Sequence, residues 1–406
     1  MRVLLVHNSY QQRGGEDAVF EAERDLLHAN GVEVVEYRVS NDAVSDMGKL
    51  ALFKNTIWSK QHYRELQKVI ADVQPDVAHF HNTLPLISPA GYYAAKRAKV
   101  PVVQTLHNYR MVCPSALLFR DGEVCRDCVG KFVPTPAIKN KCYRGSAAAS
   151  AAIAGMLTFH RARGTYKKVV DRYIALTEFA RGEYVAGGLP EDRIAIKPNF
   201  LADDPGTGDG ERNGVLFVGR LTEEKGVSVL IAAAQQLTGD QHLTIVGDGP
   251  MREAVEQAAA NNPRLTYAGG ANREQVLQAM QSAKALTFAS TWFEGFPMTI
   301  VESFACGLPV ITSDLGSMAS IVDDDRNGLL VEPGDPDAWA AAIARGCEAP
   351  TKWGDEARND FLTRYSATQN FDQLMAIYES VTGKPMPRSS DSTPSVTASL
   401  ELAARH

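Results

Sequence analysis

Two glutamates with a fixed separation are the residues of this sequence best suited to chemistry. Glu294 and Glu302 lie in TWFEGFPMTIVESFACGLPVITSD (residues 291–314), with seven residues between them. The pattern predicts a strand, a Gly/Pro loop holding Glu294, a helix that starts at Pro297, holds Glu302 and ends at Gly307, and a second strand. Ligands bind at strand ends in open α/β sheets, and the first-turn amides of a helix form an anion or hydroxyl site. The two carboxylates can therefore hold two hydroxyl-bearing parts of one ligand; the alternative is a loop acid and a solvated helix face.

A pair of cations follows an earlier strand of the same half. Gly219 ends the strand VLFVG, and Arg220 and Lys225 follow in a loop that opens a helix. A helix dipole, unpaired amides and two positive side chains attract the same oxyanions, so these residues predict a diphosphate clamp. The alternative for such a pair is a solvated surface position.

Two further strand ends of this half lie in the VGDGP turn at Gly247 and at Tyr267 to Gly269. By itself VGDGP indicates only a strand-to-helix turn. The sequence contains neither a Walker loop nor a complete G-x-G-x-x-G fingerprint, which argues against nucleotide hydrolysis and dinucleotide redox chemistry.

Histidines follow two strands of the first half. His107 ends PVVQTLH, and His79 and His81 bracket a strand end beside Asn82 in DVAHFHN. A histidine after an apolar strand can be a satisfied core residue or a functional group. We expect His107 to face the site and one of the other two to do so, with the remaining one packing in the core.

Strands and helices alternate along the chain in two sets. The first begins with RVLLVH and ends with RIAIKPN, and the second runs from VLFVG to GLLVE. This alternation predicts α/β architecture, with two Rossmann-like, doubly wound parallel sheets and a cleft between two domains. The predicted organisation is a first domain over 1–200 with an insertion over 113–142, a linker over 201–214, a second domain over 215–360, a helix over 361–382 that packs back on the first domain, and a disordered tail over 383–406.

Charge divides the chain into two different halves. Of 406 residues, 45% are hydrophobic and the formal net charge is −6. Residues 1–198 hold 27 Lys/Arg and 20 Asp/Glu, whereas the remainder holds 15 and 28. Residues 129–170 include eight basic side chains and no acidic one, within an alanine-rich stretch that suggests contact with an anionic membrane; the alternative is a packing helix with a solvated basic flank. The four-residue apolar run at the N-terminus is too short for a secretory signal, so we expect a cytoplasmic protein, peripheral on the inner membrane face, with no nucleic-acid partner.

Four of the six cysteines fall close together. Cys113, Cys125, Cys128 and Cys142 have the spacing C-x11-C-x2-C-x13-C. The central C-x2-C is typical of zinc ligands, so the cluster predicts a structural zinc; buried thiols are the main alternative and an iron–sulfur cluster a lesser one.

Most of residues 1–346 resembles the retaining glycosyltransferases of family 4, which have the GT-B fold and an E-x7-E motif. The resemblance rests on the segment around the two glutamates, on VLFVGRLTEEKGVSVLIAAAQQL, LTIVGDGPMREAVEQAA and NGLLVEPGDPDAWAAAI, and on RGGED, DVAHFHN and PVVQTLHNY in the first half. The cysteine insertion is a feature of a subgroup. One departure is LGSMASIV, where Ala319 and Ser320 stand in place of Pro-Glu, which puts local helix capping in question.

The resemblance implies a role for each motif. Glu302 would bind ribose hydroxyls, and Glu294 would contact the donor sugar beside the amides of Gly295, Phe296 and Met298. In the first half, His107 would contact the donor sugar near the reacting centre. The same resemblance implies that Gly15 approaches the donor phosphates and that Gly14, His81 and Asn82 lie on the acceptor side. It also implies that the VGDGP turn at Gly247 brings backbone close to the nucleotide and that Tyr267 to Gly269 line its base.

Catalysis is expected without a metal ion. The acidic runs DDDRNG (323–328) and PGDPD (333–337) are typical of turns, and positive side chains with a helix dipole would replace the ion. The resemblance implies transfer with retention by front-face chemistry, assisted by the leaving diphosphate.

The sequence thus predicts a hexosyltransferase of cell-surface polysaccharide synthesis. Its donor would be a nucleotide diphosphate sugar, with UDP and GDP both open, and its acceptor a glycan or a polyprenyl-diphosphate-linked molecule. Three alternatives remain open: a nucleotide-sugar epimerase, a sugar phosphorylase, or a non-catalytic partner subunit.

Overall fold

The computed structural model describes residues 1–45 and 47–385. The chain divides into two compact units, and the first consists of residues 1–117, 126–197 and the chain from Asn370 onward, while the second consists of 118–125 and 198–369. The predicted disordered tail lies outside the described residues, except for 383–385.

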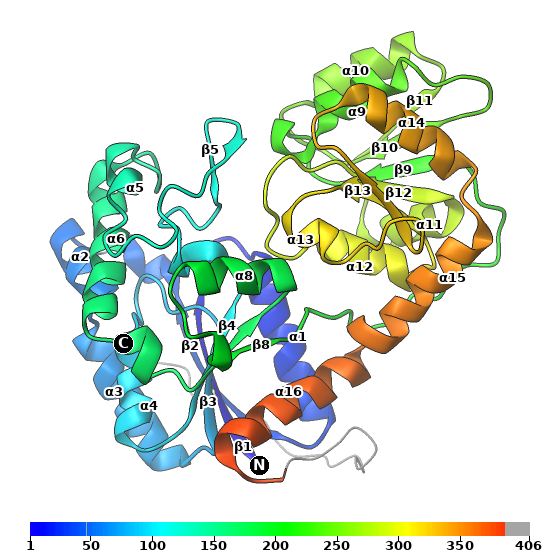
Figure 1. The fold of residues 1–406 in the computed structure, drawn as a ribbon. Helices are drawn as coiled ribbons and strands as arrows, with labels where there is room; N and C mark the ends of the chain where they lie inside the picture. Colours follow the sequence, from blue (N-terminus) through cyan, green and yellow to red (C-terminus); the bar gives the residue numbers. More distant parts are fainter. Residues whose placement is uncertain (46, 386–406) are drawn as a thin grey trace. The chain divides into compact units, whose positions relative to one another are not determined.

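The first unit is built on a parallel sheet with the strand order β2-β1-β3-β4-β7-β8. Figure 1 shows helices on both faces of this sheet. Its four inner strands are buried over most of their length, as expected of a sheet covered on both sides, whereas the edge strands β2 and β8 are more exposed. The strands are β1 (Arg2–Ser9), β2 (Glu33–Ser40), β3 (Val77–Phe80), β4 (Val102–Leu106), β7 (Arg172–Ala175) and β8 (Ile194–Ile196). The helices are α1 (Gly15–Ala29), α2 (Lys49–Ile57), α3 (Lys60–Val73), α4 (Ala90–Arg97), α5 (Thr135–Lys139), α6 (Ala147–Ala162), α7 (Thr165–Lys168), α8 (Glu178–Ala186) and α16 (Ala367–Thr382).

The second unit contains a second parallel sheet, with the order β11-β10-β9-β12-β13-β14. One apolar cluster on Trp339 and another on Phe304 cover its two faces. The strands are β9 (Val215–Val218), β10 (Leu243–Val246), β11 (Leu265–Gly269), β12 (Ala285–Phe288), β13 (Val310–Ser313) and β14 (Gly328–Val331). The helices are α9 (Val227–Ala234), α10 (Arg252–Asn261), α11 (Arg273–Ser282), α12 (Met298–Ala305), α13 (Gly316–Ala319), α14 (Pro336–Cys347) and α15 (Thr351–Asp360). A small hairpin of β5 (Phe119–Arg120) and β6 (Glu123–Val124) is grouped with this unit.

Both sheets reverse their strand order once, and such a switch point is where α/β sheets bind ligands. In the first unit β1 pairs with both β2 and β3, so the reversal lies beside β1. In the second unit β9 pairs with both β10 and β12, so the reversal lies beside β9. The predicted α/β class with two Rossmann-like parallel sheets is therefore confirmed.

The last described helix joins the first unit. A π-helical turn (Phe361–Tyr365) interrupts the helical pattern predicted over 361–382, and α16 begins after it. The Tyr378 hydroxyl on α16 lies 2.7 Å from Nδ1 of His79 on β3.

Candidate functional site

A pocket lies at the switch point of the second sheet. It is lined by the residues that follow β9, including Gly219, Arg220 and Lys225, and by Ser290 after β12 and Thr299 on α12. The sequence therefore places both predicted clamp cations at the strand ends where the topology favours a ligand.

Glu294 lies in the loop between β12 and α12 and is 8% exposed. Its Oε1 accepts hydrogen bonds from Lys225 Nζ at 2.6 Å, Ser290 Oγ at 2.6 Å and Trp292 Nε1 at 2.8 Å. Because three donors converge on one carboxylate oxygen, the orientation of this carboxylate is fixed before any ligand binds.

The two predicted clamp cations differ in their surroundings. Lys225 is half-buried: its ammonium pairs with Glu294 and lies 5.1 Å from the ring centre of Phe288 and 5.9 Å from that of Trp292. Arg220 is exposed, and within the described chain its guanidinium has no hydrogen-bond or ion-pair partner. One cation is thus held in place and the other is available to a ligand anion.

Glu302 lies on α12, inside the helix predicted for it. Among the described residues its carboxylate has no hydrogen-bond partner. Burial raises the pKa of Glu302, and the positive charge of Arg273 opposes this shift. A half-buried acceptor without a partner suits the hydroxyls of a ligand.

Backbone turns shape the same region. Gly226 has a φ of +73°, and a Cβ there would lie 2.1 Å from the carbonyl oxygen of Ala289, so only glycine fits. A Cβ at Gly247 would likewise clash with the carbonyl oxygen of Gly219. The Gly247 carbonyl accepts a hydrogen bond from Tyr267 Oη at 3.0 Å. Tyr267 therefore supports the turn that was predicted to approach the nucleotide.

The loop before α12 leaves amides unused. The N–H groups of Gly295, Phe296 and Met298 form no hydrogen bond with other described residues. The carbonyl of Gly295 accepts from Ser317 Oγ at 3.3 Å. Ser317 belongs to α13, which forms without a side-chain N-cap in the segment that departs from the family pattern.

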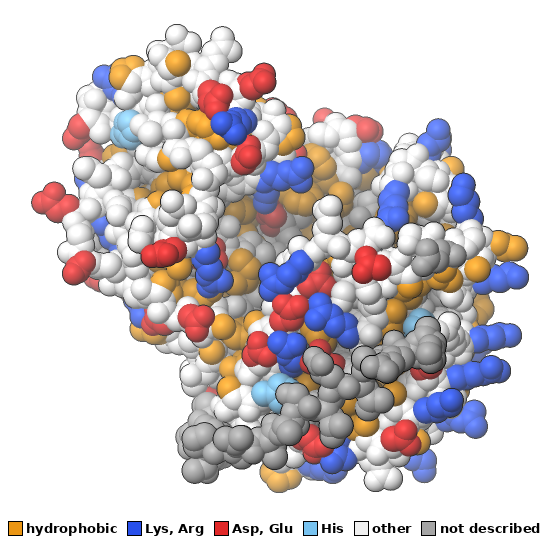
Figure 2. All heavy atoms as spheres, turned by 180° about the vertical axis from the view of Figure 1, so that it is seen from behind, with side chains coloured by type: hydrophobic (Ala, Val, Ile, Leu, Met, Phe, Trp, Pro, Cys, Tyr) orange, Lys and Arg blue, Asp and Glu red, His pale blue; other side chains and the backbone are white. Residues whose placement is uncertain are grey.

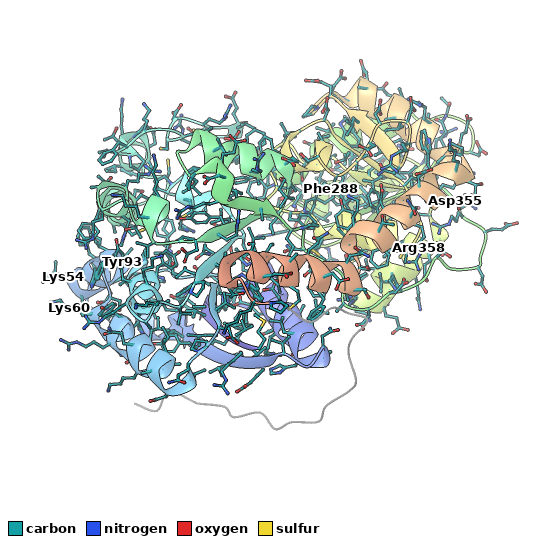
Figure 3. All side chains as sticks on the ribbon, turned by 60° about the horizontal axis from the view of Figure 1, so that its bottom comes forward. Lys54, Lys60, Tyr93, Phe288, Asp355 and Arg358 are labelled. Atoms are coloured by element: carbon teal, nitrogen blue, oxygen red, sulfur yellow. The ribbon has the colours of Figure 1, made fainter. Side chains whose placement is uncertain are left out.

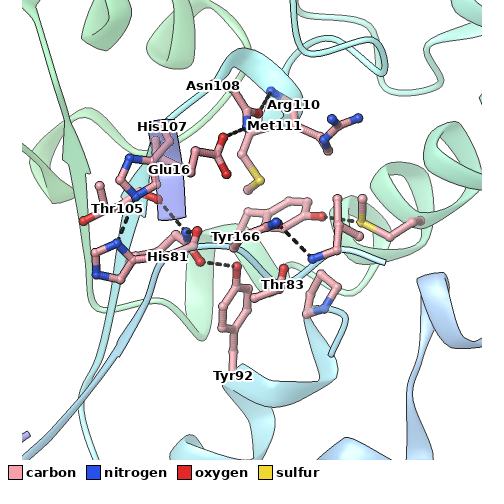
Figure 4. A pocket seen from close by; sticks show the side chains of 16 residues that line it. Glu16, His81, Thr83, Tyr92, Thr105, His107, Asn108, Arg110, Met111 and Tyr166 are labelled. Atoms are coloured by element: carbon pink, nitrogen blue, oxygen red, sulfur yellow. Dashed lines mark hydrogen bonds between the residues drawn. The ribbon is translucent and has the colours of Figure 1, made fainter. Parts of the chain in front are cut away.

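The first unit contains a pocket at the carboxyl ends of β3 and β4 (Figure 4). His81 and His107 lie on one side of it, and the thioether of Met111 and the ring of Tyr166 on another. Asn82, predicted on the acceptor side, also lines it, but its Nδ2 donates to the Asn8 carbonyl and its Oδ1 accepts from the Leu84 amide. Its side chain therefore holds the loop.

Glu16, in the first turn of α1, is a pocket residue that the sequence analysis did not single out. Its carboxylate accepts hydrogen bonds from Tyr10 Oη at 3.0 Å and from Asn108 Nδ2. Burial raises the pKa of Glu16. Glu16 is the glutamate of the RGGED motif, in which only the two glycines were predicted to be functional.

Those two glycines begin α1. Gly14 is the N-cap, and its amide donates to Asp17 Oδ2 at 2.8 Å. Neither glycine has a positive φ, and a Cβ at Gly15 would meet no atom within 4 Å. The helix N-terminus therefore has open space beside Gly15, while its direct role toward phosphates stays a prediction.

The histidines form one connected group. His107 Nε2 lies 2.9 Å from His81 Nδ1, and their rings stack at 5.1 Å. Burial lowers the pKa of His81 to about 3, and burial with the adjacent His81 holds the pKa of His107 well below its ordinary value. Both imidazoles are therefore neutral near pH 7. Of the two histidines on and after β3, His81 lines the pocket and His79 does not.

A buried ion pair beneath these rings was not predicted. Glu23 on α1 and Lys197 after β8 are 0% and 1% exposed, and Lys197 Nζ lies 3.0 Å from Glu23 Oε2. Glu23 Oε1 in turn lies 3.1 Å from His79 Nδ1 and 3.2 Å from His81 Nε2.

The four clustered cysteines do not form a ligand set. Cys113 and Cys128 are buried, Cys125 and Cys142 are half-buried, and Cys113 Sγ lies 3.1 Å from Ser115 Oγ. Within residues 1–45 and 47–385, the only His, Cys, Asp and Glu atoms that gather in a group of three within 4.8 Å belong to Glu23 and the two histidines of the β3 segment. The four sulfur atoms are therefore not gathered as a four-thiolate zinc site would require, and the structural zinc itself stays an untested prediction.

Comparisons with known protein families show the class to which this chain belongs. A model described as "Glycosyl transferase 4-like domain" matches residues 2–199, and one described as "Glycosyl transferases group 1" matches residues 203–361. The two matches follow each other along the chain, one over each parallel sheet. The chain therefore belongs to the glycosyltransferases of the GT-B fold and is a transferase enzyme.

Individual relatives support this class. The phosphatidyl-myo-inositol mannosyltransferase of Mycolicibacterium smegmatis is 28% identical over 339 residues, covering 79% of this chain and 75% of that protein. The Anabaena HepE structure in complex with UDP shares the fold with a TM-score of 0.66 at 16% identity, over 94% of this chain and 100% of that one. The lipopolysaccharide outer core galactosyltransferase WaaB also shares the fold, with a TM-score of 0.66 at 18% identity, over 94% of this chain and 99% of that one. No helix that the structure describes is both long and apolar enough to cross a membrane.

Proposed function

We propose that this glycosyltransferase transfers a hexose from a nucleotide diphosphate sugar, with retention of anomeric configuration, to a lipid-linked or glycan acceptor. The observation that carries the proposal is the pairing of Lys225 with Glu294 at a strand-end pocket, with the unpartnered Glu302 on the following helix. Cations for a diphosphate and carboxylates for hydroxyls are the groups that such a donor requires.

Each group has a distinct part in this proposal. The diphosphate would lie at Arg220 and Lys225, and the sugar would approach Glu294 and the unused amides of its loop. Glu302 would accept hydrogen bonds from ribose hydroxyls. Positioning and electrostatic stabilisation of the developing positive sugar then provide most of the rate.

The first unit would supply the acceptor site. Its pocket combines apolar side chains with Glu16, Asn108 and His107, which suits an acceptor that presents a hydroxyl beside apolar surface. Support for a lipid-linked acceptor comes from relatives whose names include phosphatidyl-myo-inositol and lipopolysaccharide.

The test is a donor screen followed by product analysis. UDP- and GDP-hexoses are incubated with the full chain and lipid-linked or glycan acceptors, and the anomeric proton of the product is measured by NMR. We expect an acceptor-dependent product that keeps the donor's configuration, at an unchanged rate in EDTA. An inverted product, or a rate abolished by EDTA and restored by Mg²⁺ or Mn²⁺, would contradict the proposal. A changed sugar nucleotide without acceptor would indicate an epimerase, and strict dependence on inorganic phosphate a phosphorylase.

A further inference from the structure

A buried polar cluster lies beneath His107 in the first unit. We call Glu23, His79, His81 and Lys197 the Glu23 cluster, and no member is more than 3% exposed. Glu23 comes from α1, the histidines from β3 and its end, and the lysine from the end of β8. A buried charge is stable only beside a partner of opposite charge or a hydrogen-bonding group, so the charge state of each member depends on the others.

The carboxylate of Glu23 is ionised. Burial acts to raise its pKa, but the Lys197 ammonium and the two imidazoles hold the pKa of Glu23 well below its ordinary value. Lys197 also donates to Asn370 Oδ1 at 3.0 Å, so the ammonium is held by two oxygens. The cluster therefore contains one negative and one positive charge.

These charges argue against a metal ion, although Glu23 and the two histidines lie close enough to ligate one. The carboxylate is already neutralised by Lys197, and a divalent ion would add two uncompensated charges to a buried site. Both ring nitrogens of His79 are also engaged, with Tyr378 Oη at 2.7 Å and Thr105 Oγ1 at 2.7 Å. The charge of the cluster is therefore balanced without an ion.

The charge of Glu23 decides which nitrogen of His81 carries the proton. His81 Nε2 lies 3.2 Å from Glu23 Oε1, and neither buried atom forms a hydrogen bond that meets ordinary geometry in the described chain. The carboxylate is the charged group nearest to this nitrogen, so its field acts on the proton of the ring. A lone pair directed at a carboxylate is repelled, whereas an N–H is attracted. His81 therefore carries its proton on Nε2, and its Nδ1 has a lone pair.

The state of His81 then determines the state of His107. His107 Nε2 lies 2.9 Å from His81 Nδ1, so it must carry the proton of this hydrogen bond. The remaining nitrogen of His107, Nδ1, is unprotonated and has no partner among the described residues. His107 lines the pocket and is half-buried.

We propose that Glu23 and Lys197 are positioning residues that act through His81 to fix His107 with its proton on Nε2 and an acceptor at Nδ1. Nδ1 would then accept a hydrogen bond from a hydroxyl of the acceptor bound in this pocket; only this last step rests on the proposed function.

The arrangement should not respond to pH near neutrality. The titratable groups that act on the two rings are Glu23, His79 and His7, and His7 is itself paired with Asp17. Lys197 contacts Glu23 and acts on the rings only through it. Burial lowers the pKa of His81 to about 3, far below pH 6. The same nitrogens should therefore carry protons from pH 6 to pH 8.

The test is a tautomer measurement by long-range ¹H–¹⁵N NMR on the full chain with labelled histidines. In the wild type we expect His81 and His107 both to be neutral, with the proton on Nε2. Glu23→Gln replaces an acceptor by an amide that can donate to His81 Nε2. We expect the proton to move to Nδ1 in both rings, with kcat reduced by about tenfold or more, the usual range for losing one oriented catalytic group.

A matched control is available in the same unit. Glu65 faces His62 at 3.1 Å on α3, so Glu65→Gln makes the same change beside a histidine that is not linked to His107. We expect this variant to leave both rings and kcat unchanged. UDP or GDP binding, which the proposed function assigns to the second unit, should be equal in all three proteins.

Two outcomes would overturn the proposal. One is a wild-type His107 with its proton on Nδ1, which needs no variant and therefore decides the matter even if Glu23→Gln does not fold. The other is a folded Glu23→Gln protein in which both tautomers stay unchanged. If the tautomers behave as expected but no hexose is transferred, the proposed function fails while the positioning network stands.

Discussion

The two units use charged residues in different ways. In the second unit, Arg220 is exposed without a side-chain partner in the described chain, and the carboxylate of Glu302 also lacks one. In the first unit, Glu23 and Lys197 are buried and neutralise each other. Unused hydrogen-bonding capacity at an exposed position suits the capture of a charged ligand, whereas a buried, charge-balanced pair suits the orientation of a neighbouring group. We therefore expect the exposed charges of the second unit to serve binding and the buried pair of the first unit to serve positioning.

The strongest test of this contrast is Glu294→Gln. Glu294 belongs to the second unit, but hydrogen bonds fix its carboxylate, as contacts fix the charged groups of the first unit. Its carboxylate is held by Lys225, Ser290 and Trp292. We expect kcat to fall by about 10²–10³-fold, the range for removing one electrostatic group at a reacting centre. Nucleotide affinity, measured by calorimetry, should change little. Glu348→Gln, on an exposed carboxylate, is the control; a loss confined to nucleotide affinity would instead make Glu294 a binding residue.

The next effect concerns the two cations. Lys225→Ala should weaken binding of a nucleoside diphosphate by about 1.5–3 kcal/mol, the usual contribution of a charged hydrogen bond, and leave nucleoside binding unchanged. Arg220→Ala should act in the same direction but less strongly, since an exposed cation is screened by water. Calorimetry with UDP or GDP and the matching nucleoside measures the difference. Equal losses for nucleotide and nucleoside would argue against a diphosphate clamp.

Glu302 links the contrast to pH. Burial raises the pKa of its carboxyl, so this group takes up a proton at a higher pH than an ordinary glutamate does. A protonated carboxyl accepts fewer hydrogen bonds, so nucleoside affinity should fall as pH is lowered through this raised pKa. Glu302→Gln should weaken binding by about 1.5–3 kcal/mol and remove the pH response. A response that persists in the variant would assign it to another group.

The sequence predicted the second unit better than the first, for a physical reason. Arg220, Lys225 and Glu294 each follow a strand within a few residues, and parallel strands bring such positions to one sheet edge. Local spacing was therefore enough to place these residues at one sheet edge, while their roles toward a ligand rested on the family resemblance and stay predictions.

The buried network of the first unit depends on contacts between distant segments. Glu23 and Lys197 are separated by 174 positions, and His79 and Tyr378 by 299. Glu23 lies within an amphipathic helix pattern, where one acid among several looks like a surface residue. Periodicity cannot show that its particular position faces the sheet, so the sequence indicated the histidines but not the groups that orient them.

The contrast also predicts that the first unit, not the second, contacts a membrane. The effects expected from variants that test this are the smallest. Figure 2 shows Lys and Arg side chains gathered along one edge of the molecule, and in Figure 3 the labelled Lys54 and Lys60 point outward from α2 and α3. On α2, Leu50 is 68% exposed and Phe53 39% exposed, in a helix without an acidic residue. Basic and apolar side chains on one exposed helix are typical of reversible binding to an anionic surface.

The apolar face of the alanine-rich helix is buried, whereas membrane contact by the exposed lysines of residues 129–170 stays a prediction. Ile153, Ala154 and Leu157 of α6 are buried, so this helix serves mainly as packing beneath α2. We therefore expect vesicles rich in anionic lipid to bind the full chain and neutral vesicles not to, as measured by co-sedimentation.

Leu50→Ser with Phe53→Ser, and Lys54→Glu with Lys60→Glu, separate the two contributions. Each lysine near an anionic surface contributes roughly 1 kcal/mol, so loss of both charges should reduce the partition coefficient by about tenfold or more. Leu362→Ser and Lys352→Glu are matched controls, because they change an exposed leucine and an exposed lysine of the second unit. If these controls reduce vesicle binding as much as the α2 and α3 variants do, attraction to the anionic surface is not confined to the first unit. If none of the variants changes binding, the basic edge is only a solvated surface, and the division of charge between the units serves the ligands alone.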